Sequence, residues 1–463
     1  MEKRGDVNAV DTEPVKTDRA APALSTAATS TWNLATRFAF QFSFVYFIVF
    51  CLVFGLPRVY AGIFQTKLPD WTNQGLLEPL SPIMAWVGRQ VFGVDVALRE
   101  SGSGDQAIIW VFVFCNLVVA LVAAALWAVL DRRRPNYQTL HAWFLLVIRL
   151  CLAGTMLVYG LAKAIPLQMP EPPLTALLTP YGNFTPMRVL WLQVGSSPVY
   201  EMLLGFAEVL AGVLLFLPRT ATLGALLSLV SMAQVFILNM TFGVPVKILA
   251  FHLVLLSLVL LAPQARKLAN VLVLQRPTGP AAQPDPFRTR RVRLIAVGLQ
   301  VALGAWAILG LVPQNLKNWN ESGGGAPKPP LYGIWSVSEF SQDGQPLPPL
   351  ITDQNRWQRV IFDVGAMTYQ KMDGSLVHAI GAVDSEAHTI TVSEATTGAG
   401  PVQMVRPEPK QIATFTFTQP APDRLRLDGQ LNGHAVTLSL EQVDLDSFRL
   451  RSTEFRWVQD YPR

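Results

Sequence analysis

Ionisable side chains lie inside segments of this sequence that are too long and too apolar to belong to a soluble protein. A charge at the centre of a bilayer costs about 2.5–3.5 kcal/mol even on lenient insertion scales, so such residues usually face the interior of a helix bundle. We therefore expect them to mark a functional site within the membrane. The residues are Arg149, Lys163, Glu208, Lys247 and His252, with Glu201 at the mouth of one segment.

The spacing of these charges predicts ion pairs between two neighbouring antiparallel helices. Arg149 and Lys163 differ by roughly 40° in azimuth on one ideal helix, and Glu201 and Glu208 differ by about 20° on the next. Each pair therefore lies on one face of its helix. At about 1.5 Å of rise per residue, Lys163 and Glu201 reach similar depths near the outer boundary, while Glu208 lies near mid-depth. The predicted ion pairs are Lys163 with Glu201 and Arg149 with Glu208.

A further helix carries Lys247 near its outer end and His252 near mid-depth, about 140° apart in azimuth. If both contribute to one cavity, it contains three cations and two carboxylates, which suits an anionic or carbonyl-bearing ligand. The alternative is that paired charges only pack and register the helices and that the lysines extend to the outer headgroups. Neutral hydrogen-bonding side chains available to the same cavity are Tyr159, Gln234 and Asn239.

Composition agrees with a polytopic membrane protein. The chain has 463 residues, of which 51% are hydrophobic and 15% charged, and its mean hydropathy is +0.33. The net charge of +5 comes largely from Lys and Arg in short loops beside apolar runs, where such residues set the orientation of the helices in the membrane. We therefore expect no nucleic-acid partner. The cysteines lack C-x-x-C spacing and a nearby His, so neither a disulfide nor a metal site is expected. They are Cys51, Cys115 and Cys151.

Seven stretches are long enough to cross a bilayer core of about 30 Å. More Lys and Arg residues lie in the connections on one side than on the other, so the N-terminal tail, residues 1–35, is predicted to be cytosolic. The chain after the seventh span then lies outside, in the periplasm if the membrane is the inner membrane of a bacterium. Within a transmembrane domain at 36–313, the predicted spans are 36–56, 107–130, 141–165, 199–217, 221–241, 244–262 and 291–312.

Two of the predicted outer connections are long. The first, 57–106, contains PIMAWVGRQVFGV, which predicts a short helix that either lies at the membrane interface or packs as an ordinary loop helix. The second, 166–197, contains six prolines, which disfavour regular helix and favour a rigid cap over the outer mouth of the bundle.

A different pattern begins after the last span. Residues 314–330 form a Gly/Pro-rich linker, and in 331–463 the apolar period drops to two, as in ATFTFTQ and HAVTLSL. Eight or so short strands and no clear helix predict a small all-β antiparallel barrel or sandwich. Hairpin turns are predicted at Asp343-Gly344, Asp373-Gly374, Asp428-Gly429 and Asn432-Gly433.

The helical region resembles the DoxX family of bacterial membrane proteins. VIRLCLAGTMLVYGLAKAIP has an early Arg and a G-x-x-K at the helix end, and YEMLLGFAEVLAGVLLFLPRTATLGALL follows with E-x-x-x-G. The resemblance covers residues 141–275 and implies a four-helix core and an association with quinone-linked sulfur or thiol redox systems, often as an accessory subunit. The matching positions are Arg149, Gly160, Lys163, Glu208 and Gly212.

The C-terminal domain resembles the lipocalin-like barrels. Gly333-Ile334-Trp335 is similar to their G-x-W motif in the first strand. The resemblance implies that an Arg near the chain end, here Arg456, stacks over the indole of Trp335, a contact that contributes about 0.5–2 kcal/mol. The domain is then either a ligand-binding barrel or a lid and docking surface.

Two functional hypotheses follow, and the sequence does not decide whether the protein is an enzyme. Walker, dinucleotide-binding, zinc-protease and serine-hydrolase motifs are absent from the sequence. The first hypothesis is a redox-associated protein, with no covalently bound cofactor. It binds a quinone-like or other small carbonyl or anionic ligand in a polar cavity, in the outer half of the third to sixth predicted spans. The second is a non-enzymatic module for a small solute or lipid, or an assembly subunit, whose β-domain docks a periplasmic or redox partner. A membrane carboxylase of the vitamin-K-dependent type is a distant third.

Overall fold

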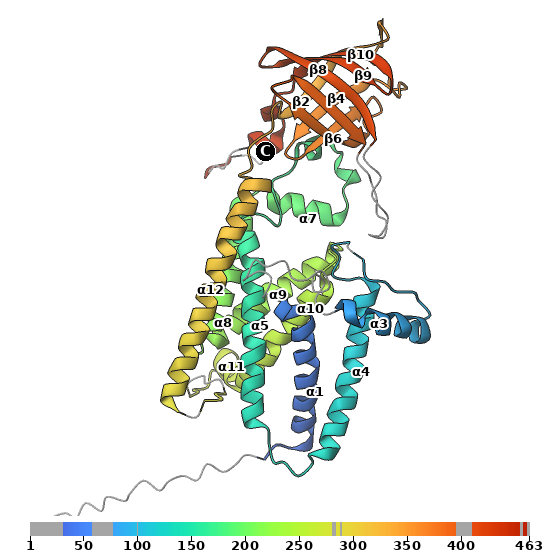
Figure 1. Cartoon of the computed structure of the whole chain (residues 1–463). Coiled ribbons are helices and arrows are strands. Elements are labelled where there is room, and N and C mark those ends of the chain that lie inside the picture. The colour runs from blue at the N-terminus through green and yellow to red at the C-terminus, as the bar shows by residue number, and fades with distance from the viewer. Residues whose placement is uncertain are drawn as a thin grey trace, which may run out of the picture.

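The computed structural model describes residues 31–57, 77–99, 101–279, 284–287, 289–394, 410–453 and 457–460. Within these ranges, seven helices are long and apolar enough to cross a membrane. Their number and places confirm the predicted multi-pass fold (Figure 1). The orientation in the membrane stays a prediction. The spans are α1 (Leu34–Phe50) with the π-helical turn η1 (Cys51–Gly55), α4 (Ala107–Leu130), α5 (Gln138–Ala164), α8 (Pro198–Phe216), α9 (Ala221–Thr241), α10 (Lys247–Leu261) with η4 (Ala262–Gln264) and α11 (Ala265–Leu272), and α12 (Arg290–Ser322).

Helix α5 is the central element of the bundle. In its most apolar 18-residue stretch, 72% of the residues are buried, whereas the corresponding stretches of the other spans have 28–50% of their residues buried. It packs closely against α8 because small residues face one another. A Cβ on Gly205 of α8 would overlap the backbone of Ala164, and one on Gly160 of α5 would lie 2.7 Å from the amide nitrogen of Val209. Small residues of this kind let membrane helices approach closely, so they set the register of α5 against α8.

The first long connection contains α3 (Leu77–Phe92), which confirms the predicted helix. Leu77 and Met84 are buried in a cluster with residues of α4, whereas Ile83 and Trp86 are exposed. The helix therefore packs on α4 through one face and leaves Ile83 and Trp86 exposed. It lies beside α4 in Figure 1.

The proline-rich connection is more helical than predicted. It contains α6 (Leu174–Leu178), η3 (Tyr181–Asn183) and α7 (Pro186–Gly195). Proline is compatible with the first position of a helix, where its missing N–H has no intrahelical partner. Pro186 occupies that position in α7, and the side chain of Thr185 caps the helix by accepting a hydrogen bond from the Arg188 amide. The expectation that the prolines disfavour regular helix was therefore wrong for α7.

The last helix is longer than the predicted span. Helix α12 continues through Pro313 and ends at Ser322, within the stretch predicted to be a linker. It runs beside the bundle up to the barrel (Figure 1). The glycines that follow turn the chain closely around Trp319, because a Cβ on Gly323 would lie 2.8 Å from its Cα.

The C-terminal part is a closed antiparallel barrel of eight strands. The sheet order is β10-β9-β8-β7-β6-β5-β4-β2, with the short β3 beside β2, and pairing of β10 with β2 closes it. Closure leaves the sheet without free edges. Of the two predicted all-β forms, the structure is therefore the barrel and not the sandwich. The strands are β2 (Gly333–Gln342), β3 (Gln345–Pro346), β4 (Trp357–Asp363), β5 (Ala366–Lys371), β6 (Leu376–Asp384), β7 (Thr389–Glu394), β8 (Gln411–Ala421), β9 (Arg424–Leu431) and β10 (His434–Gln442), followed by η5 (Leu445–Ser447) and α13 (Arg449–Ser452).

Three of the four predicted turns connect neighbouring strands, with positive φ at Gly344, Gly374 and Gly433. Asp428-Gly429 instead lies inside β9, so that prediction was wrong. A Cβ on Gly429 would overlap the backbone of Thr414 on β8, which explains the glycine by close strand packing rather than by a turn.

Trp335 lies in the barrel core, as its motif predicts. It is 1% exposed, and its indole Nε1–H donates a 2.8 Å hydrogen bond to the carbonyl of Leu331. Arg456 lies outside the described residues, so the stacked pair with Trp335 stays a prediction.

The barrel docks on the second long connection, residues 166–197, which we call the cap. Leu174 of α6 packs with Ile334 and Ile361 of the barrel, and all three are fully buried. The Leu174 amide donates a 2.7 Å hydrogen bond to the carboxylate of Asp363. The cap is therefore held between the barrel and the helices, with α7 beneath the barrel (Figure 1).

Candidate ligand-binding site

A cavity of about 140 Å³ lies between α5, α8, α9 and α10, under the cap. Most of its wall is apolar, with Met156, Leu204, Val235 and Leu253 among the lining side chains. Trp191 of α7 closes the cap side, where its indole Nε1–H donates a 3.0 Å hydrogen bond to the carbonyl of Gln168. The polar side chains in the wall are Thr155, Tyr159, Lys163, Gln168, Glu208, Ser231, Gln234 and Asn239.

Lys163 and Glu208 form a buried ion pair in the cavity wall. The Lys163 ammonium donates to both carboxylate oxygens of Glu208, at 2.7 and 2.9 Å. The side chains are only 7% and 4% exposed. Close packing of α5 on α8 at Gly160 brings the two together, because a Cβ on that glycine would contact Glu208 itself.

Glu201 does not pair with Lys163 as predicted. It is fully buried in the first turn of α8, where a carboxylate is favoured by the helix dipole. Its Oε1 accepts a 2.9 Å hydrogen bond from the Met169 amide. Glu201 thus anchors the cap segment, and it does not line the cavity.

Arg149 does not pair with Glu208. Its guanidinium donates to the side-chain oxygen of Gln300 on α12, at a second pocket far along α5 from Lys163. Both predicted pairings failed for one reason. Gly205 of α8 lies against Ala164 of α5, so α8 is displaced along α5 by more than one helical turn from the assumed alignment.

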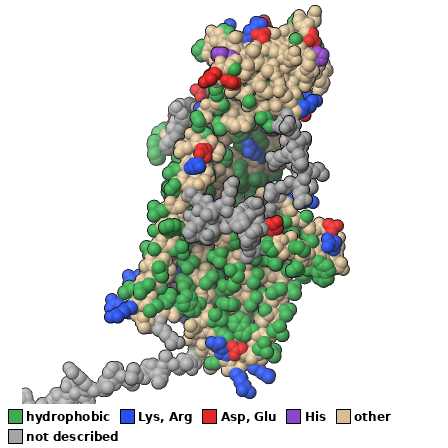
Figure 2. Space-filling view, in the orientation of Figure 1, with side chains coloured by type: hydrophobic (Ala, Val, Ile, Leu, Met, Phe, Trp, Pro, Cys, Tyr) green, Lys and Arg blue, Asp and Glu red, His purple; other side chains and the backbone are tan. Residues whose placement is uncertain are grey.

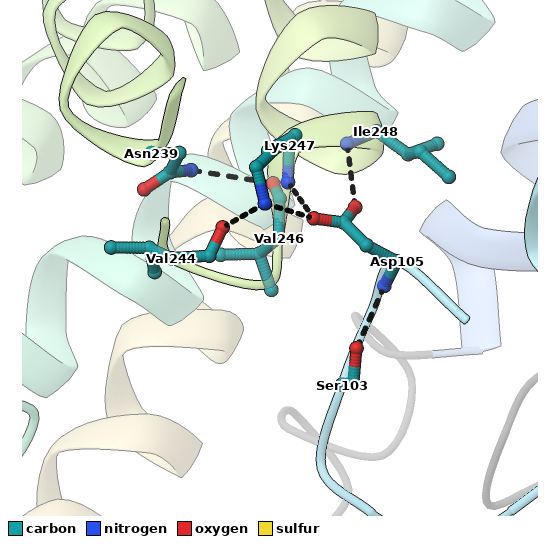
Figure 3. A network of polar contacts seen from close by, with 7 residues as sticks. All are labelled: Ser103, Asp105, Asn239, Val244, Val246, Lys247 and Ile248. Atoms are coloured by element: carbon teal, nitrogen blue, oxygen red, sulfur yellow. Dashed lines mark hydrogen bonds and ion pairs between the residues drawn. The ribbon is translucent and has the colours of Figure 1, made fainter. Parts of the chain in front are cut away.

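Lys247 is engaged outside the cavity, in the network of Figure 3. Its ammonium donates to Asp105 at 3.2 Å and to the carbonyl of Val244 at 3.0 Å. The carboxylate of Asp105 also accepts the backbone amides of Lys247 and Ile248, which begin α10. Asp105 therefore caps α10 and ties it to the segment before α4. Asp105 was not predicted, because its place just before α4 gives no local signal that it caps α10, 142 residues further along the chain.

His252 also lies outside the cavity. Its Nδ1 is 2.7 Å from the carbonyl of Ile248, which can only accept, so Nδ1 carries a proton and donates. Its Nε2 is 2.8 Å from the hydroxyl of Tyr46, and the imidazole stacks on Phe50 at 4.0 Å between centroids. Both ring nitrogens are thus occupied, Nδ1 by a contact within α10 and Nε2 by a contact that joins α10 to α1. Tyr46 was not singled out by sequence, since an aromatic residue in an apolar span gives no distinguishing signal.

The electrostatics of the cavity differ from the expected excess of cations. Of the predicted charged residues, only Lys163 and Glu208 line it, and they neutralise one another. Tyr159, Gln234 and Asn239 do line it, as predicted, and the Asn239 amide donates to the Val246 carbonyl at 3.3 Å. Among the described residues, no group of His, Cys, Asp and Glu is arranged to hold a metal ion.

The fold and this site together define a multi-pass membrane protein with a cavity beneath a barrel-held cap. No protein-family model matches the sequence, and no solved structure gives a significant match. Over 123 residues the chain is 37% identical to the uncharacterized protein YwoB of Bacillus subtilis (strain 168), covering 27% of this chain and 78% of YwoB. The chain therefore belongs to the family of YwoB. The resemblances to DoxX and lipocalin-like proteins stay predictions.

Proposed function

We propose that this protein binds a small, uncharged ring compound with carbonyl or hydroxyl groups, such as a quinone, in the cavity beneath the cap. The observation that carries the proposal is a cavity of about 140 Å³ whose charged lining residues form one matched pair. A cavity of about 150 Å³ in another protein binds benzene, so this volume accommodates a single six-membered ring.

The polar groups of the wall suit the oxygens of such a ring. An ammonium group has three donors, and Glu208 receives two hydrogen bonds from Lys163, which leaves one donor for a ligand carbonyl. Tyr159 and Gln234 add neutral hydrogen-bonding groups. An anionic ligand is disfavoured, because Glu208 already neutralises Lys163.

The cavity also has a route for an apolar tail. Gln234 of α9 lines the cavity and is itself exposed, so the cavity reaches the outer surface of that helix. A prenyl chain on the ring would then extend into the bilayer. The resemblance to DoxX favours a quinone among such compounds, and with it a redox association.

The experiment is a titration of the full-length purified protein with a short-chain quinone, followed by equilibrium dialysis. Ala207→Leu adds volume inside the cavity, keeps both members of the ion pair, and should weaken quinone binding about tenfold or more. Leu203→Phe is the matched control on α8, because Leu203 is 62% exposed and does not line the cavity. An aromatic carboxylate of the same ring size should bind more weakly than the quinone.

Equal quinone affinity in the wild type and Ala207→Leu would contradict the proposed site. The absence of quinone binding in the wild type would remove the proposal. It would leave the non-enzymatic alternative, in which the barrel docks a periplasmic partner. One observation favours a structural role for the barrel, namely that its own residues Ile334 and Ile361 hold Leu174 of the cap.

A further inference from the structure

A second pocket of about 680 Å³ lies at the end of the helical region away from the barrel, where Lys and Arg side chains gather in Figure 2. It is formed by α5, the turn between α8 and α9, the segment 284–287 and α12. Its lining includes three guanidinium groups and one carboxylate, those of Arg149, Arg219, Arg293 and Asp285. The pocket is separate from the cavity beneath the cap, since the two share no lining residue.

Arg149 is the unusual member of this pocket. It is 6% exposed, and its one hydrogen bond in the described structure goes to the neutral side chain of Gln300. Its buried Nε has no hydrogen-bond partner. Within the described ranges, no carboxylate lies within ion-pair distance of Arg149. A buried guanidinium without a counter-ion is costly, so the arrangement points to an anion that the pocket receives from outside the chain.

The other groups at the pocket reinforce the positive potential. Arg293 contacts Asp285, and its side chain stays 54% exposed. Arg219 is exposed and forms no ion pair in the part of the chain that the structure describes. Thr220, which precedes α9, also lines the pocket. The N-terminal end of α9, which carries the positive end of the helix dipole, therefore lies beside the pocket.

Apolar side chains complete the wall and favour a lipid as the source of the anion. Leu145, Leu146, Leu294 and Val297 line the pocket beside the guanidinium groups. Leu294 is 60% exposed, so an acyl chain can continue from the pocket along α12. Basic pockets between membrane helices are typical sites for anionic lipid headgroups.

We propose that this pocket binds a phosphate ester group, supplied by an anionic phospholipid, between Arg149 and Arg219. Guanidinium groups match phosphate oxygens in geometry and form charge-assisted hydrogen bonds. Gln300 holds the Arg149 guanidinium in place, because its own amide donates a 2.9 Å hydrogen bond to the Ala296 carbonyl.

The test compares ligands on the full-length protein, purified in a neutral detergent. Phosphatidylglycerol, phosphatidylcholine and inorganic phosphate are each titrated, and the midpoint of thermal unfolding is followed. Phosphatidylglycerol should raise the midpoint at the lowest concentration. Arg149→Gln and Arg219→Gln should each weaken its apparent affinity by about tenfold or more. Arg290→Gln is the matched control, since Arg290 is exposed on α12 and does not line the pocket.

Stabilisation by inorganic phosphate as strong as that by phosphatidylglycerol would support the phosphate site and overturn its assignment to a lipid. Equal affinity for phosphatidylglycerol and phosphatidylcholine, or unchanged affinity in both arginine variants, would overturn the proposal. Arg219→Gln alone carries the test if Arg149→Gln does not fold, because Arg219 is exposed.

Discussion

Lys163 and Arg149 lie on the same helix, α5, and each is only 6% exposed, yet their surroundings are opposite. Lys163 has a carboxylate partner on α8, at two short distances. Arg149 has a neutral amide on α12. A buried charge in a membrane helix is therefore not by itself a sign of a charged ligand, because an oppositely charged side chain can neutralise it within the protein. A cation without a counter-ion is the stronger sign of an anionic ligand.

The largest expected effect concerns the matched pair. Glu208→Leu should destabilise the protein by about 3–5 kcal/mol, because it leaves the Lys163 ammonium buried and unpaired. The double variant Lys163→Met with Glu208→Leu should recover much of the loss. Chemical unfolding of the detergent-solubilised protein measures both. A double variant as unstable as the single one would mean that the pair is not the reason for the loss.

The register of α5 against α8 gives the next largest effect. Gly205→Ala places a methyl group against the Ala164 backbone, so it should cost about 1–3 kcal/mol and separate Lys163 from Glu208. Gly298→Ala is the control, because a Cβ at Gly298 on α12 meets nothing within 4 Å. Equal unfolding free energies for the two variants would show that this contact does not fix the register.

A smaller loss is expected for the cap of α10. Asp105→Ala removes the acceptor of the Lys247 and Ile248 amides and the partner of the Lys247 ammonium. The stability should fall by about 0.5–2 kcal/mol, the usual cost of losing a helix cap. Quinone affinity should not change, since Asp105 does not line the cavity. A large change in that affinity would place the Lys247 network in the ligand site after all.

The smallest effect on stability is expected at Arg149. In lipid-free detergent, Arg149→Leu should change the unfolding free energy by less than about 1 kcal/mol, or raise it, because an uncompensated buried charge is replaced by an apolar side chain. The same unfolding experiment measures it. A loss as large as that of Glu208→Leu would show that Arg149 holds the bundle together and is not kept for a ligand.

The spans and the barrel could be predicted from sequence because both depend on local periodicity. The length of an apolar segment identifies a membrane helix. Two segments of alternating apolar and polar residues, with Asn432-Gly433 between them, identify a hairpin. Asp428-Gly429 gave the same local signal but lies in β9, where close packing on Thr414 requires the glycine. Sequence alone could not separate these two uses of glycine.

The residue types of the candidate site could be predicted, but their partners could not. Lys163, Glu208 and Tyr159 do share a cavity. The pairing depends on how far α8 slides along α5, which Gly160 and Gly205 decide through tertiary packing. The partners of Arg149 and His252 come from α12 and α1, at large separations along the chain. Helix azimuths on one pair of helices carry no information about those contacts.

The measurement that tests the comparison most directly is mass spectrometry of the small molecules that co-purify with the full-length protein. Wild type, Ala207→Leu and Arg149→Gln are prepared from the same membranes. The account predicts that Ala207→Leu loses the ring compound and keeps the anionic phospholipid, while Arg149→Gln loses the phospholipid and keeps the ring compound. Two results would contradict the presence of two separate sites. In the first, each variant loses both the ring compound and the phospholipid. In the second, each variant keeps both.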